Sequence, residues 1–77
     1  MEIKLRYFGQ LQELTGKSEE VFTVSLDTVG ALRQYLIERY PKLDELNFKM
    51  AQDNKINSDS SPLNGGLIDL LPPFSGG

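Results

Sequence analysis

The sequence contains no cysteine and no histidine. Without cysteine, the chain has no disulfide framework, no thiolate metal site and no iron–sulfur cluster. It also lacks the two side chains that enzymes use most often as nucleophile and as general base. These absences argue against an enzyme acting alone, and we expect the chain to hold no metal and no cofactor of its own.

Positive charge is scarce as well, because 8 Lys and Arg stand against 11 Asp and Glu, for a net charge of −3. Nucleic-acid-binding domains usually present a basic patch, so we expect no nucleic-acid partner. No apolar run approaches the roughly 20 residues that span a bilayer. The residues after Met1 alternate between charged and apolar, unlike a signal peptide. We therefore expect one cytoplasmic domain, residues 1–77, with no membrane contact.

The hydrophobic pattern predicts an α+β domain in which one main helix covers one face of a mixed sheet. Alternating or continuous apolar residues predict strands at 2–8, 20–26, 48–52, 55–57 and 67–71. A short helical turn is predicted at 10–16. The main helix begins after Thr28, a good N-cap, and stops before Pro41. The last strand is nearly all apolar, which predicts a central strand covered on both faces.

The chain ends in Pro72-Pro73-Phe74-Ser75-Gly76-Gly77. Proline removes backbone donors and glycine resists order, so residues 72–77 are predicted to form an extended tail of roughly 20 Å reach. The two glycines are thin enough to pass through a partner's channel, and the prolines would stiffen the base. On this interpretation the terminal carboxylate is the reacting group, activated by AMP and attacked by sulfur to give a thiocarboxylate. The alternative is an ordinary frayed terminus.

Short motifs run along the whole chain: Leu5-Arg6-Tyr7-Phe8-Gly9, Glu13-Leu14-Thr15-Gly16, Thr28-Val29, Leu32-Arg33, Arg39-Tyr40-Pro41 and Leu70-Leu71-Pro72-Pro73-Phe74-Ser75-Gly76-Gly77. Together they resemble the small, sulfur-carrier subunits of molybdopterin synthase. The resemblance implies a β-grasp, ubiquitin-like fold with a flexible Gly-Gly tail, in which the first and last strands lie parallel at the sheet centre. Two positions depart from that family. Asn64-Gly65-Gly66-Leu67 replaces an acidic turn, and Asp69 stands where a small residue is usual.

The resemblance also implies a chemical role for Gly77. An E1-like adenylating enzyme would use ATP to activate its carboxylate, which would then become a thiocarboxylate. Ser75 and Gly76 would carry this group into the large subunit of molybdopterin synthase, within a heterotetramer. There the sulfur would pass to the pyranopterin precursor during molybdenum cofactor biosynthesis. The pterin-binding and catalytic side chains would belong to the large subunit.

An apolar partner surface is predicted beside the tail. It consists of Phe8, Leu67, Leu71, Pro72, Pro73 and Phe74. The acidic pair Glu19-Glu20 is interpreted as ordinary solvated surface.

Three other functions stay open: a sulfur carrier for thiamine or tRNA thiolation, a ubiquitin-like modifier, and a β-grasp interaction module with an inert tail. Thiazole carriers lack the Pro-Pro-Phe-Ser-Gly-Gly type of ending and the Tyr-Phe-Gly segment, which favours molybdopterin.

Overall fold

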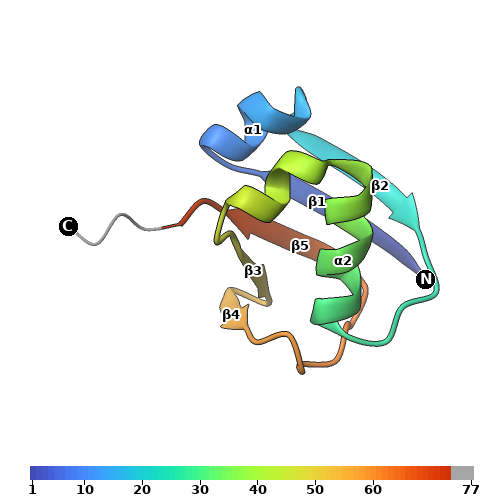
Figure 1. Ribbon diagram of the computed structural model, residues 1–77. Coiled ribbons are helices and arrows are strands. Elements are labelled where there is room, and N and C mark those ends of the chain that lie inside the picture. Colours follow the sequence, from blue (N-terminus) through green and yellow to red (C-terminus); the bar gives the residue numbers. More distant parts are fainter. Residues whose placement is uncertain (74–77) are drawn as a thin grey trace.

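The computed structural model describes residues 1–73 of the chain, and residues 74–77 lie outside that description. Figure 1 shows five strands and the helices that accompany them. In chain order the elements are β1 (Glu2–Tyr7), α1 (Gln10–Thr15), β2 (Glu19–Thr23), α2 (Val29–Arg39), the 3₁₀ helix η1 (Pro41–Glu45), β3 (Lys49–Gln52), β4 (Lys55–Asn57) and β5 (Gly66–Leu71).

The strands form one mixed sheet in the order β2-β1-β5-β3-β4. β1 and β5 pair in parallel, whereas the other neighbours pair antiparallel. The first and last strands therefore lie side by side at the centre, as the β-grasp expectation required. The main helix α2 crosses one face of this sheet (Figure 1).

Local signals account for the predicted boundaries of α2 and of the β3–β4 hairpin. The Thr28 hydroxyl accepts a hydrogen bond from the backbone N–H of Ala31 at 3.1 Å, which caps the start of α2. Pro41 begins η1, so the α-helix ends before it. Asp53 and Asn54 both have positive φ, of 52° and 62°, which is the backbone of a tight two-residue hairpin turn. These three predictions are confirmed.

The core lies between the sheet and the helices. It is built from the inward face of each strand and the apolar side of each helix. β1 contributes Ile3, Leu5 and Tyr7, and the helices contribute Leu11, Val29, Leu32, Leu36 and Leu43. Within residues 1–73, every buried side-chain nitrogen and oxygen has a hydrogen-bond partner, so the core carries no unsatisfied polar group there.

The prediction that the last strand is covered on both faces is wrong. Ile68 and Leu70 are almost fully buried against the helices, but Leu67 on the other face is 46% exposed. The run of apolar residues suggested two covered faces, yet α2 packs on one face of the sheet and Leu67 on the other face stays exposed. Leu43 lies in η1. β1 ends at Tyr7, one residue earlier than predicted, and β2 spans Glu19–Thr23.

Candidate functional site

The base of the tail lies where the central strands β1 and β5 end together. Tyr7 of β1 is in register with Leu70 of β5. The backbone N–H of Phe8 then donates to the Leu70 carbonyl at 3.2 Å, which continues the ladder one step past β1. On the other side Leu71 pairs with Lys49 of β3. β5 ends at Leu71, as predicted, so the tail starts from a strand held on both sides.

The predicted partner residues that the structure describes lie along the open face of the sheet or at its tail end. Phe8 is 36% exposed and Leu67 is 46% exposed. Leu71, Pro72 and Pro73 are half-buried. Leu67 is in register with Lys4, near the start of both central strands, whereas Phe8 follows the last paired residue of β1. The predicted surface therefore extends along the whole length of β5.

An ion pair divides this surface into two parts. The Arg6 guanidinium donates to both carboxylate oxygens of Asp69, with Nε–Oδ1 at 2.7 Å and Nη2–Oδ2 at 3.0 Å. The central carbon of the Arg6 guanidinium, Cζ, lies 5.6 Å from the centroid of the Phe8 ring. A carboxylate at position 69, unusual for the family that the sequence resembles, thus has a fixed partner here. The pair holds Arg6 beside Phe8, at the tail end of the open face.

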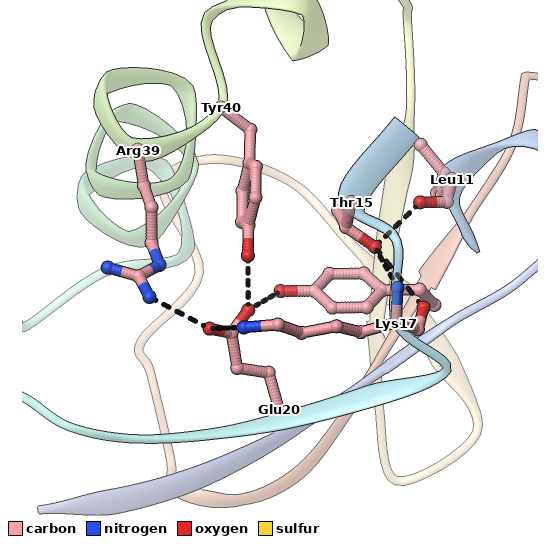
Figure 2. Close-up of polar contacts among 7 residues, drawn as sticks. Leu11, Thr15, Lys17, Glu20, Arg39 and Tyr40 are labelled. Atoms are coloured by element: carbon pink, nitrogen blue, oxygen red, sulfur yellow. Dashed lines mark hydrogen bonds and ion pairs between the residues drawn. The ribbon is translucent and has the colours of Figure 1, made fainter. Parts of the chain in front are cut away.

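The interpretation of Glu19-Glu20 as ordinary solvated surface is wrong for Glu20. Its side chain is only 10% exposed and accepts four hydrogen bonds (Figure 2). One carboxylate oxygen accepts from the hydroxyls of Tyr7 and Tyr40, both at 2.8 Å. The other accepts from Lys17 at 3.0 Å and from Arg39 at 3.1 Å. We call these five residues the Glu20 cluster.

The pKa of Glu20 follows from this environment. Burial by itself would raise the pKa, but the hydrogen bonds from Lys17, Tyr40 and Tyr7 outweigh it and lower the pKa to about 2. Burial and the hydrogen bond to Glu20 both raise the pKa of Tyr7. At neutral pH the cluster therefore holds Glu20 as a carboxylate and Tyr7 as a protonated phenol. It ties the end of β1 to β2 and to the end of α2, and so fixes the strand end beside the tail.

The described residues offer little else that could carry chemistry. Among residues 1–73, no three acidic side chains gather in a way that could hold a metal ion. No helix in that part of the chain has the length and apolar character needed to cross a bilayer.

Four predicted site residues lie outside the described residues: Phe74, Ser75, Gly76 and Gly77. Their roles stay predictions. Conversely, Gly9 and Glu20 were not predicted as site residues. Gly9 directly follows the tail end of β1, and the Glu20 carboxylate on β2 accepts a hydrogen bond from Tyr7, the last residue of β1. Gly9 follows two aromatic residues at a strand end, which is a weak sign of a special backbone conformation.

Comparison with known proteins identifies the family. Residues 5–77, almost the whole chain, match the ThiS family. The chain belongs to the ThiS family. With its mixed five-stranded sheet and main helix, it is a β-grasp protein of the ThiS sulfur-carrier type.

Solved structures share this fold over nearly their full length. A Pyrococcus furiosus protein described as molybdopterin converting factor, subunit 1, superimposes with a TM-score of 0.85 at 21% identity, covering 96% of this chain and 99% of that one. Small archaeal modifier protein 1 (SAMP1) of Haloferax volcanii gives 0.80 at 21% identity, with 100% of both chains covered. SAMP1 of Methanosarcina acetivorans gives 0.77 at 22% identity, covering 99% and 96%. At sequence identities of 21% and 22%, the similarity to these proteins is a similarity of fold.

Proposed function

We propose that this ThiS-family chain is the sulfur-carrier subunit of a molybdopterin synthase. An E1-like enzyme joins the Gly77 carboxylate to AMP from ATP and releases pyrophosphate. A sulfur nucleophile then displaces AMP and leaves a thiocarboxylate at Gly77. The large synthase subunit receives this group, and the thiocarboxylate sulfur bonds to the pyranopterin precursor. Water then cleaves the resulting thioester, which leaves the sulfur on the pterin and returns the Gly77 carboxylate. The chain acts in the cytoplasm and is not a catalyst alone.

The position of the tail is the observation that supports this proposal most strongly. Residues 72 and 73 follow directly after the central strand β5, which is paired on one side with β1 and on the other with β3. A carrier needs a rigid body to be recognised and a thin end that reaches another enzyme's active site. Ser75 and Gly76 would occupy that active site, which would supply the pterin-binding side chains.

The open face supplies a surface for the large subunit. Phe8 and Leu67 are exposed at its two ends, and Leu71, Pro72 and Pro73 border the tail. Exposed apolar side chains rimmed by charge are the usual composition of a protein interface. Docking of this face would place the tail at the active site of the large subunit, in a heterotetramer of two small and two large subunits.

The test is reconstitution from purified components. The chain is incubated with the E1-like enzyme, ATP and a sulfur source, and the large subunit and the pyranopterin precursor are then added. The full chain should yield molybdopterin, measured as its fluorescent oxidation product. The matched control lacks only Gly77 and should yield none. Equal product from both chains would contradict the proposal.

A second function is a ubiquitin-like modifier. It is favoured by the likeness to SAMP1 of Haloferax volcanii over the full length of both chains. The same adenylate would then be attacked by a lysine amine of another protein instead of by sulfur. Covalent adducts of the chain that resist reducing agent would support this function, whereas molybdopterin formation without such adducts would favour the carrier.

A further inference from the structure

Gly9 connects β1 to α1 with a backbone that suits glycine alone. Its φ is +58° and its ψ is −133°. A side chain in this region clashes with the neighbouring backbone, so residues other than glycine rarely adopt it. The turn is also held in place from the α1 side. The Phe8 carbonyl accepts from Leu11 N–H at 3.1 Å, and the Gly9 carbonyl accepts from Gln12 N–H at 3.0 Å.

The space beside Gly9 is occupied by the first residue of the tail. A Cβ atom built on Gly9 would lie 3.2 Å from Cγ of Pro72, 3.8 Å from its Cβ and 3.9 Å from its Cδ. The three nearest atoms therefore all belong to one proline ring, and the shortest distance is below ordinary van der Waals contact. Because position 9 has no side chain, the ring of Pro72 can lie directly against its backbone.

The strand end holds the chain just before this contact. The Phe8 N–H donates to the Leu70 carbonyl, and Pro72 comes two residues later. One turn thus supplies both a hydrogen bond to the last strand and an open place for the proline. Proline has a fixed φ, so its placement sets the direction in which the chain continues.

We infer that Gly9 is a positioning residue for the tail, which sets the direction of the tail through its contact with Pro72. This role rests on the proposed function, because direction matters only if the tail must reach a partner's active site. The substitution Gly9→Ala would push Pro72 aside by a few tenths of an ångström, and it would also strain the turn. Both changes would misdirect the tail, while no exposed side chain of the open face is replaced.

Three variants separate these effects. Gly9→Ala is compared with Gly16→Ala, since Gly16 also has positive φ, +76°, but a Cβ there would meet nothing within 4 Å. Pro72→Ala removes the Cγ atom that makes the 3.2 Å approach. If the contact is responsible, Gly9→Ala should have little further effect in a chain that already carries Pro72→Ala. If only backbone strain is responsible, Gly9→Ala should have the same effect in both backgrounds.

The first readout is the rate of Gly77 adenylation by the activating enzyme. Gly9→Ala should lower kcat roughly tenfold while KM changes little, because docking is preserved and only the placement of the reacting group is lost. Gly16→Ala should leave both constants near those of the unmodified chain. A Gly9→Ala variant with the kinetics of Gly16→Ala would overturn the inference, as would an equal loss with and without Pro72→Ala.

The second readout does not depend on sulfur chemistry. The chain has no cysteine, so spin labels can be placed at Gln34→Cys in α2 and Ser75→Cys in the tail without first removing any native cysteine. Gly9→Ala should shift the distribution of label distances and Gly16→Ala should not. In a chain that already carries Pro72→Ala, Gly9→Ala should add little further shift. Identical distributions in all variants would overturn the inference even if the chain carries no sulfur. A clear shift without adenylation would instead count against the proposed function alone.

Discussion

Two groups of contacts meet at the end of β1, and they differ in how many hydrogen bonds they contain. On the helix side, the Glu20 carboxylate accepts four hydrogen bonds, from Tyr7, Lys17, Arg39 and Tyr40. On the tail side, the Leu70 carbonyl accepts one hydrogen bond from Phe8, and Pro72 lies against Gly9 without any hydrogen bond to it.

This difference separates two requirements of a carrier. The Glu20 cluster holds the strand end in one position through several charge-assisted bonds, which suits a rigid scaffold. The tail base relies on shape and a fixed φ, because Pro72 contacts Gly9 without a hydrogen bond to it. The predictions below disturb the two regions separately.

The largest effect on stability is expected from Glu20→Ala. It would leave the buried hydroxyl of Tyr7 without its acceptor and remove the partner of two cations, at a cost of about 3 kcal/mol in the free energy of unfolding. Urea denaturation measures it. Glu19→Ala is the matched control, because within residues 1–73 the one ion pair of Glu19 is with Lys4 and both side chains are about half exposed. It should change stability by less than about 0.5 kcal/mol. Equal stability of the two variants would show that the Glu20 cluster contributes nothing to the free energy of unfolding.

The same carboxylate should give a pH-dependent contribution of about 2 kcal/mol, after allowance for partial solvent access. The pKa of Glu20 is about 2 in the folded chain, against an ordinary value of 4.5. Because the folded pKa is the lower one, the contribution is complete above pH 4.5 and is lost as pH falls toward 2. The stability difference between the unmodified chain and Glu20→Gln should therefore shrink over this window. A difference that stays constant between pH 7 and pH 2 would contradict the assigned pKa.

On the tail side, Phe8→Ala should weaken binding to the proposed large subunit about tenfold, or roughly 1.4 kcal/mol, while stability changes little. Phe8 is partly exposed beside the tail base. Val21→Ala is the control, since Val21 is 55% exposed on the edge strand β2, away from the tail. Isothermal titration calorimetry gives both affinities. If Val21→Ala weakens binding as much as Phe8→Ala, the interface is not centred on the tail.

The smallest effect is expected from Asp69→Ala. The ion pair with Arg6 is bidentate but partly exposed, with 42% of the Arg6 side chain and 20% of the Asp69 side chain accessible to solvent. Its loss should cost less than about 1 kcal/mol, and the cost should decrease at high salt because ions screen exposed charges. Thermal unfolding at low and high salt measures it. A large loss of stability that does not change with salt would mean that the ion pair is shielded from solvent, as a buried pair is.

The sequence predicted features that depend on neighbouring residues. Alternation placed Ile3, Leu5 and Tyr7 in the core, and Thr28 marked the start of α2 correctly. Features that depend on tertiary packing were missed. No local pattern indicates that Glu20 meets donors from three other parts of the chain, and an apolar strand does not show which of its faces the helices will cover.

The candidate site also has features that the sequence predicted and features that depend on tertiary packing. Motifs in the sequence predicted the family and the end of strand pairing at Leu71, and the structure agrees with that end. The contact between Gly9 and Pro72 joins two segments far apart in the chain, so only the folded structure brings it into view. The chemistry assigned to Gly77 rests on a residue outside the described part and needs its own measurement.

The most direct test of the carrier role is the intact mass of the chain after incubation with the E1-like enzyme, ATP and a sulfur source. The account predicts a gain equal to the exchange of one oxygen for sulfur, located at Gly77 by fragmentation and absent when Gly77 is deleted. A full-length chain that is adenylated but never gains sulfur, or that gains it equally without Gly77, would contradict the account.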